Sequence, residues 1–153
     1  MSTRPDPLED TTGDLERPPA RVLLAEDDAE MRSLLQLSLE DAGYEVTALA
    51  NGVDLLHELE RAHRTPTRPP YGLVVSDVRM PGPTGLEILD ALHGRAWLPP
   101  VILITAFGDA ALHEEGRRLG AVAVLDKPFE TDRLVALVGQ NLSRPPSRIE
   151  DLS

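Results

Sequence analysis

The chain has 153 residues, of which 41% are hydrophobic and 27% are charged, a balance typical of one soluble globular domain. Its formal net charge of −11 disfavours direct contact with nucleic acid or an anionic membrane, because phosphate groups repel an acidic surface. Cysteine is absent, which excludes disulfides and thiolate chemistry, and no apolar run approaches the roughly 20 residues that cross a bilayer, so we expect a cytoplasmic protein.

The two ends of the chain differ in composition from its middle. Residues 1–19 combine four prolines with five acidic residues and have almost no apolar side chains, so we expect a disordered leader. Residues 143–153 resemble them, and Pro145 and Pro146 are expected to end the preceding helix and begin a flexible C-terminal tail. One compact domain is expected over residues 20–142.

Five short apolar runs within this domain predict strands. They are Val22–Ala25, Glu45–Leu49, Leu73–Ser76, Val101–Thr105 and Ala121–Leu125. The runs start 23, 28, 28 and 20 residues apart, which is the length of a strand–helix–strand unit rather than of a hairpin. Continuous β-branched runs such as VILIT are typical of parallel strands that are buried on both faces.

The segments between these runs have the i, i+3, i+4 spacing of amphipathic helices. Five helices are expected, over residues 31–42, 53–59, 86–92, 110–119 and 131–142. Gly43 is expected to cap the first helix, and Thr131 is expected to open the last. Five such units predict an α/β fold, a doubly wound five-stranded parallel sheet with five helices in a three-layer sandwich.

Polar residues follow or end four of the predicted strands. They are Glu26, Asp27 and Asp28 after the first, Asp77 after the third, Thr105 at the end of the fourth and Lys127 after the fifth. Ligands bind beyond the carboxyl ends of strands in open parallel sheets, so these side chains are expected to meet. Crowded carboxylates favour a cation, and oxygen ligands suit Mg²⁺ (or Mn²⁺). A nucleophilic carboxylate, a hydroxyl and an ammonium group are also what phosphoryl transfer requires.

Each of these residues also has a purely structural interpretation. Residues 26–28 are acids that would favour a helix N-terminus, and Asp77 would suit the turn before a Pro-Gly-Pro loop. Thr105 would be an ordinary strand residue and Lys127 an ordinary solvated lysine. Their coincidence at the same end of strands in four separate units argues for a functional site.

Four sequence strings carry a resemblance to a known family. LLAEDDAEMR, VVSDVRMPGPTGLE, ILITAFGD and LDKPF have the order and spacing found in the receiver domains of two-component response regulators. The resemblance covers residues 20–142 and implies a flavodoxin-like fold. It also implies a phosphorylation switch, a signalling protein rather than an enzyme, that accepts a phosphoryl group from a histidine kinase or a phosphotransfer protein.

The resemblance implies a role for each matched residue. Asp77 would be the phosphoacceptor, and Thr105 and Lys127 would contact the phosphoryl group. Asp77 would also bind Mg²⁺ together with Asp27 and the backbone carbonyl of Arg79. Glu26 would act on the metal through water, and Asp28 would only cap a helix.

The resemblance also implies how a signal would leave the site. A downstream protein would dock on the face formed by the fourth helix, fifth strand and fifth helix of a monomer or phosphorylation-dependent dimer. Many receivers carry an aromatic switch residue at the position of Val124, so we expect Thr105 and residues 107–109 to carry the movement here. Phe107 is expected to slow hydrolysis of the acyl phosphate, and Pro128 to follow a cis peptide bond.

Three other interpretations fit part of this pattern. An enzyme of the haloacid-dehalogenase type also uses a nucleophilic Asp and Mg²⁺, but it needs an acid where this chain has Arg79. A degenerate receiver would act as a constitutive protein-binding module. The chain would otherwise be the receiver part of a longer regulator with an output domain; nothing after Leu142 resembles one, so a single-domain regulator is preferred.

Overall fold

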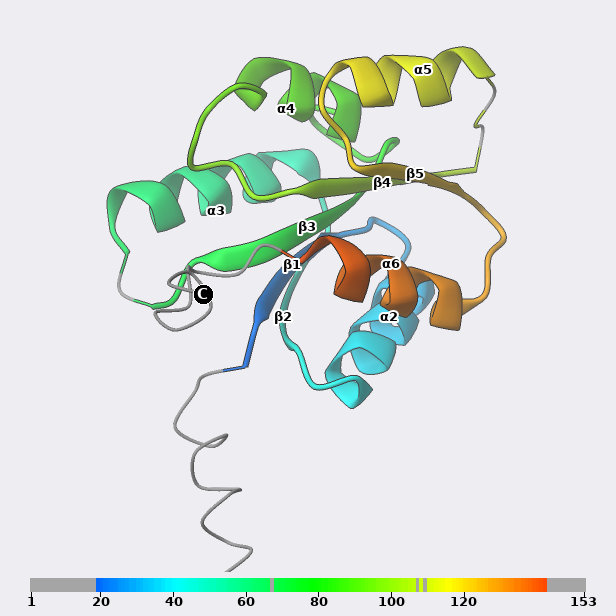
Figure 1. The fold of residues 1–153 in the computed structure, drawn as a ribbon, viewed down its shortest axis with the longest axis horizontal. Coiled ribbons are helices and arrows are strands. Elements are labelled where there is room, and N and C mark those ends of the chain that lie inside the picture. Colours follow the sequence, from blue (N-terminus) through cyan, green and yellow to red (C-terminus); the bar gives the residue numbers. More distant parts are fainter. Residues whose placement is uncertain (1–18, 67, 107, 109, 143–153) are drawn as a thin grey trace, which may run out of the picture.

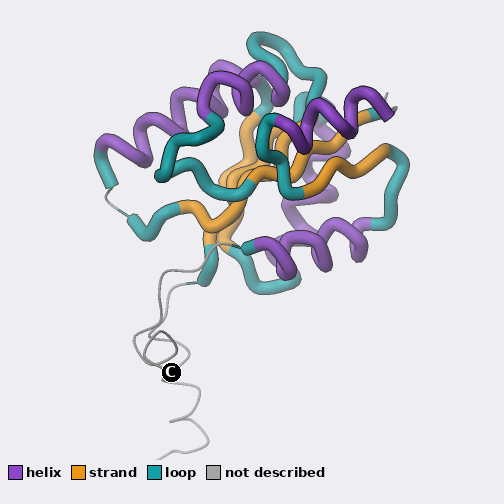
Figure 2. The backbone as a smooth tube through the Cα atoms, turned by 45° about the horizontal axis from the view of Figure 1, so that its top comes forward, coloured by secondary structure: helices purple, strands orange, loops and turns teal. Residues whose placement is uncertain are grey.

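The computed structural model describes residues 19–66, 68–106, 108 and 110–142 of the chain. In this part, five parallel strands form one sheet in the order β2-β1-β3-β4-β5, with helices on both faces (Figures 1 and 2). The elements are β1 (Arg21–Ala25), α2 (Ala29–Asp41), β2 (Glu45–Leu49), α3 (Gly52–Arg64), β3 (Tyr71–Asp77), α4 (Gly85–Leu92), β4 (Val101–Thr105), α5 (Ala110–Arg118), β5 (Ala123–Asp126) and α6 (Thr131–Asn141). The predicted doubly wound α/β fold is confirmed. The expected leader up to residue 18 and the expected tail over residues 143–153 lie outside the described residues.

The sheet is apolar on both faces because helices cover both. Helices α3, α4 and α5 lie on one face, where Leu23 and Leu103 belong to the core, and α2 and α6 lie on the other, with Val22 and Leu24 (Figure 1). All four of these side chains are fully buried. Consecutive strand residues point to opposite faces, so an uninterrupted apolar run is what a strand covered on both sides requires.

Side-chain caps determine where several helices begin. Asp28 Oδ1 accepts hydrogen bonds from the backbone N–H groups of Glu30 (3.0 Å) and Met31 (3.4 Å), so α2 begins at Ala29, two residues earlier than predicted. Thr84 and Glu87 form a reciprocal capping box at the start of α4. These polar residues close the turns that carry the chain from the sheet edge into the next helix.

The fifth strand was expected from Ala121, but β5 begins at Ala123. The N–H of Ala121 donates to the carbonyl of Gly116 at 2.9 Å, so this residue still closes the end of α5. The regular ladder starts with Ala123, which pairs with Ile102 of β4. The prediction was wrong by two residues because an apolar run does not reveal which of its N–H groups a preceding helix uses.

The strand order places the carboxyl ends of β1 and β3 side by side. The chain passes from β1 outward to β2 on one side and from β3 outward to β4 and β5 on the other. Ala25 pairs with Ser76, so the residues that follow them in the chain, Glu26 and Asp77, lie side by side at the edge where the strands end. This reversal of strand order is the usual ligand position in an open α/β sheet.

Candidate functional site

Three carboxylates meet at this edge of the sheet. Glu26 and Asp27 come from the turn between β1 and α2, and Asp77 is the last residue of β3. One oxygen atom from each lies within 4.8 Å of the others. Glu26 and Asp77 are buried, whereas Asp27 is exposed, so the cluster has a closed side and a side that faces solvent. The structure therefore brings together the three acids that the sequence proposed as metal ligands.

Lys127 bridges the two buried carboxylates from the end of β5. Its Nζ atom lies 3.0 Å from Asp77 Oδ2 and 3.0 Å from Glu26 Oε1. Burial by itself would lower the pKa of Lys127, but the contacts with Asp77 and Glu26 outweigh it and leave the pKa above its usual value. The ammonium group is therefore charged and partly neutralises the acidic cluster.

The buried acid Glu26 has a raised pKa. Burial raises its pKa to about 7, and the neighbouring charge of Asp77 acts in the same direction. The N–H of Asp28, which donates to Glu26 Oε2 at 3.1 Å, and the ammonium of Lys127 oppose this shift. Among the described residues, no hydrogen bond of good geometry reaches the buried Oε1 atom, although Lys127 Nζ lies close to it. A buried carboxylate with one such oxygen is suited to a further cationic partner.

Thr105 and the backbone of Arg79, the other two parts of the predicted site, lie at the same edge of the sheet. Thr105 is the last residue of β4 and is 1% exposed. Its carbonyl accepts a hydrogen bond from the N–H of Lys127 at 2.7 Å, which joins the hydroxyl-bearing and lysine-bearing segments. The N–H of Arg79 lies 3.4 Å from Asp77 Oδ1, so the backbone after β3 folds back toward the carboxylate. Metal binding by the Arg79 carbonyl stays a prediction.

Two glycines allow the turn after Asp77 to pack closely. A Cβ atom at Gly85 would lie 2.7 Å from the Asp77 carbonyl, and a Cβ atom at Gly52 would overlap the carbonyl oxygen of Pro83. The N–H of Gly52 donates to the carbonyl of Pro81 at 3.0 Å. The start of α3 thus supports the turn that follows the predicted phosphoacceptor.

Sequence reasoning missed Arg32, which supports the acidic turn. Its Nη1 atom donates to the carbonyl of Glu26 at 2.9 Å and reaches that of Asp27 at 3.5 Å. Arg32 lies within the string LLAEDDAEMR, but no residue spacing indicates that a side chain will reach a backbone carbonyl after folding. The guanidinium fixes the backbone that presents two of the three acids.

Three further predictions concern Pro128, Val124 and Phe107. The Lys127–Pro128 peptide bond is cis, as expected. Val124 is half-buried on β5 and faces α5, where a Cβ atom at Gly116 would lie 2.9 Å from Val124 Cγ2. Phe107, the residue expected to affect acyl phosphate lifetime, lies outside the described residues, as does Asp109.

Known proteins share this sequence pattern. A family profile described as the response regulator receiver domain matches residues 22–139. The transcriptional regulatory protein FixJ of Bradyrhizobium diazoefficiens is 38% identical over 117 residues, which are 76% of this chain and 54% of that protein. The C4-dicarboxylate transport transcriptional regulatory protein DctD of Pseudomonas aeruginosa is 40% identical over 122 residues, 80% of this chain and 25% of that protein. The chain thus spans between a quarter and about half of the length of these two relatives.

Solved structures share the fold. The receiver domain of Francisella response regulator 1452 has a TM-score of 0.70 and 27% identity, and the match covers 79% of this chain and 94% of that one. The chemotaxis protein CheY4 of Vibrio cholerae has a TM-score of 0.69 and 29% identity, and the match covers 81% of this chain and 99% of that one. Together with the profile match, these likenesses show that the chain belongs to the response regulator receiver domain family of two-component systems.

Proposed function

We propose that this receiver domain is a phosphorylation switch in which Asp77 accepts a phosphoryl group from a histidine kinase or a phosphotransfer protein. The observation that carries the proposal is the position of the Asp77 carboxylate. It lies at the reversal of strand order, beside two further acids and 3.0 Å from the ammonium group of Lys127. A nucleophilic carboxylate next to groups that bind anionic oxygens is the arrangement that phosphoryl transfer requires.

The residues of the cluster fit a divalent cation such as Mg²⁺ or Mn²⁺. Three carboxylates supply oxygen ligands without histidine or cysteine, which suits a hard ion. Glu26 adds a buried oxygen, Oε1, that lies 3.0 Å from the ammonium of Lys127 and accepts no hydrogen bond of good geometry from the described residues. Asp27, Asp77 and the carbonyl of Arg79 would hold the ion directly, with Glu26 acting through water. When bound, such an ion neutralises charge that develops on the phosphoryl oxygens.

The protein's own groups then have distinct tasks. A carboxylate oxygen of Asp77 forms a bond to phosphorus as the phosphorus–nitrogen bond of the donor phosphohistidine breaks, and the imidazole leaves. The ammonium of Lys127 holds one phosphoryl oxygen, and the hydroxyl of Thr105 donates to another. The product is an acyl phosphate, which water hydrolyses slowly back to the carboxylate. Self-phosphorylation by small phosphodonors is a modest activity of the same site.

Phosphorylation would change the affinity of the domain for a downstream protein. Movement of Thr105 toward the phosphoryl group shifts an equilibrium between two arrangements of the face formed by α5, β5 and α6. This face would bind the target, in a monomer or in a phosphorylation-dependent dimer. Within the described residues, no helix combines the length and apolarity needed to span a membrane. A cytoplasmic location and the absence of direct contacts with nucleic acid or membrane are part of the proposal.

The proposal is tested with acetyl phosphate and Mg²⁺, with intact mass as the readout. Wild-type protein should gain one phosphoryl group, and Asp77→Asn should gain none. Asp90→Asn is the matched control, because it removes one negative charge from an exposed position of α4 and should behave as wild type. Chelation of the metal should abolish the gain. Incorporation into Asp77→Asn, or none into wild type, would contradict the proposal, and the second result would favour a constitutive binding module.

A further inference from the structure

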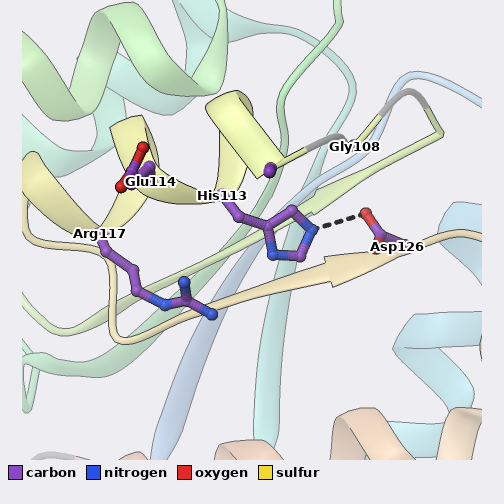
Figure 3. Close-up of a pocket in the computed structure, with 6 residues that line it drawn as sticks. Gly108, His113, Glu114, Arg117 and Asp126 are labelled. Carbon is purple, nitrogen blue, oxygen red and sulfur yellow. Dashed lines mark hydrogen bonds and ion pairs between the residues drawn. The ribbon is translucent and has the colours of Figure 1, made fainter.

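A second polar group of residues lies between α5 and the carboxyl end of β5 (Figure 3). It surrounds an open groove of about 510 Å³. The groove is lined by Gly108, Ala110, His113, Glu114, Arg117 and Asp126. The proposed phosphoryl chemistry uses none of these side chains, yet they lie on two of the three elements of the proposed target-binding face.

His113 joins the helix to the strand. Its Nε2 atom lies 2.9 Å from Asp126 Oδ1, and Figure 3 shows the ring pointing to this carboxylate while Glu114 points away. The His113 side chain is 22% exposed and that of Asp126 is 52% exposed. The pair is accessible at the surface, so changing it should not disturb the core.

Asp126 also touches the segment that carries the switch hydroxyl. It pairs in register with Thr105 and immediately precedes Lys127, whose N–H donates to the Thr105 carbonyl at 2.7 Å. A Cβ atom at Gly108 would overlap Asp126 Oδ1 and would lie 2.9 Å from Thr105 Cγ2. The backbone at Gly108 therefore packs directly on both residues, and Thr105 has little room to move without a change in this contact.

The helix is also packed closely on the strand below the groove. A Cβ atom at Gly116 would lie 2.9 Å from Val124 Cγ2 and 3.2 Å from Leu103 Cδ1. Only glycine permits this approach, so the α5 backbone lies directly over the half-buried Val124. At this end of the groove, the contact between His113 and Asp126 provides a polar link between α5 and β5.

We propose that His113 and Asp126 are positioning residues that hold α5, Gly108 and Thr105 in the arrangement of the unphosphorylated domain. Their contact weakens when Thr105 moves toward the phosphoryl group, because Asp126 is in contact with both the moving segment and the helix. Since coupling between two sites is reciprocal, a contact that is stronger in the unphosphorylated state opposes phosphoryl binding at Asp77. This inference rests on the proposed function.

The test measures, by calorimetry in saturating Mg²⁺, how tightly the wild-type chain, His113→Ala, Asp126→Ala and the double variant bind beryllofluoride. Each single variant should bind about two- to fivefold more tightly, the size expected for a surface ion pair. The double variant should show no further gain, because either substitution already removes the contact. His57→Ala, an exposed histidine on α3, is the matched control and should bind as wild type.

A purely structural contact would give a different result. It would stabilise the free and the bound domain equally, so its loss would lower the free energy of unfolding but leave the beryllofluoride affinity unchanged. If the wild type binds beryllofluoride and both single variants bind it no more tightly, this inference is overturned and the proposed function stands. Failure of the wild type to bind beryllofluoride and to incorporate phosphoryl groups overturns the proposed function and this inference with it.

Discussion

Lys127 Nζ lies 3.0 Å from Asp77 Oδ2 and 3.0 Å from Glu26 Oε1, so one ammonium group serves two buried carboxylates. It is also the only lysine of the chain, because the other 14 basic residues among the 15 are arginines. An ammonium is a compact charge that can turn from one oxygen to another, whereas a guanidinium is planar and prefers paired oxygens. In the proposed function, a lysine at this position would compensate charge in the free domain and contact a single phosphoryl oxygen in the phosphorylated one.

Replacement of this lysine should separate metal binding from phosphoryl transfer. Lys127→Met should raise Mg²⁺ affinity by roughly three- to tenfold, because a fixed cation next to the ligands no longer repels the ion. It should also slow phosphorylation by acetyl phosphate. Calorimetry and intact mass give the two readouts. Lys127→Arg keeps the charge and should leave Mg²⁺ affinity near that of wild type, and weaker Mg²⁺ binding by Lys127→Met would contradict the proposed site.

Two adjacent acids should have different effects on metal binding. Asp27 belongs to the acidic cluster, whereas Asp28 caps α2, so Asp27→Asn should lower Mg²⁺ affinity by at least about tenfold. Asp28→Asn removes the same charge one residue away and keeps a capping oxygen, so its affinity should change little. Calorimetric titration distinguishes the two, and equal losses would show that net charge, not ligation, controls binding.

The turn after Asp77 should be sensitive to the start of α3. Gly52→Ala places a methyl group against the Pro83 carbonyl, so it should lower the free energy of unfolding by about 1–3 kcal/mol. It should also weaken Mg²⁺ binding by moving the turn that contains Arg79. In Gly139→Ala, the new methyl group on α6 would lie 3.5 Å from the Tyr44 hydroxyl, an ordinary contact, and should stabilise by about 0.5–1 kcal/mol. Urea denaturation compares both, and a Gly52→Ala protein as stable as wild type would exclude the close packing.

A buried phenol at the opposite edge of the sheet should make stability pH-dependent. The Tyr71 hydroxyl donates to Glu58 Oε2 at 2.6 Å and lies 3.1 Å from Thr47 Oγ1. Burial, followed by the hydrogen bond to Glu58, raises the pKa of Tyr71 above its usual value of 10.0. Because the folded state favours the neutral phenol, this stabilisation is complete below pH 10.0 and is lost as the pH rises through the higher folded pKa.

Glu58, which accepts the Tyr71 hydroxyl, makes stability depend on pH at the acidic end. The hydrogen bond from Arg61 lowers the pKa of Glu58 below its usual value of 4.5. The stability that Glu58 contributes is therefore present above pH 4.5 and is lost as the pH falls through the lower folded pKa.

Removal of the phenol hydroxyl tests this pH dependence at the alkaline end. Tyr71→Phe should cost about 1 kcal/mol of unfolding free energy at neutral pH. The stability difference between wild type and Tyr71→Phe, from urea denaturation, should shrink above pH 10.0. A constant difference across that range would show that the phenol is not held neutral by the fold.

Local and periodic features of the sequence account for the fold. The apolar runs that predict five strands correspond to residues covered by helices on both faces, as at Val22 and Leu23. The cap at Asp28 and the positive φ of 101° at Gly43 follow from residues next to one another in the chain. The gathering of Asp77 and Lys127 also follows, because parallel strands place all their carboxyl ends at one edge of the sheet.

Tertiary packing alone decides which of these groups become buried or paired across elements. Glu26 and Asp27 are adjacent acids, and their spacing does not show which one is buried; folding buries the first, raises its pKa to about 7 and leaves the second exposed. Tertiary packing also brings His113 into contact with Asp126 and Gly52 into contact with Pro83. Residue spacing encodes the direction of a side chain along its own helix or strand. Distances between elements depend on how closely each helix packs against the sheet, and this packing is set by all the core side chains together.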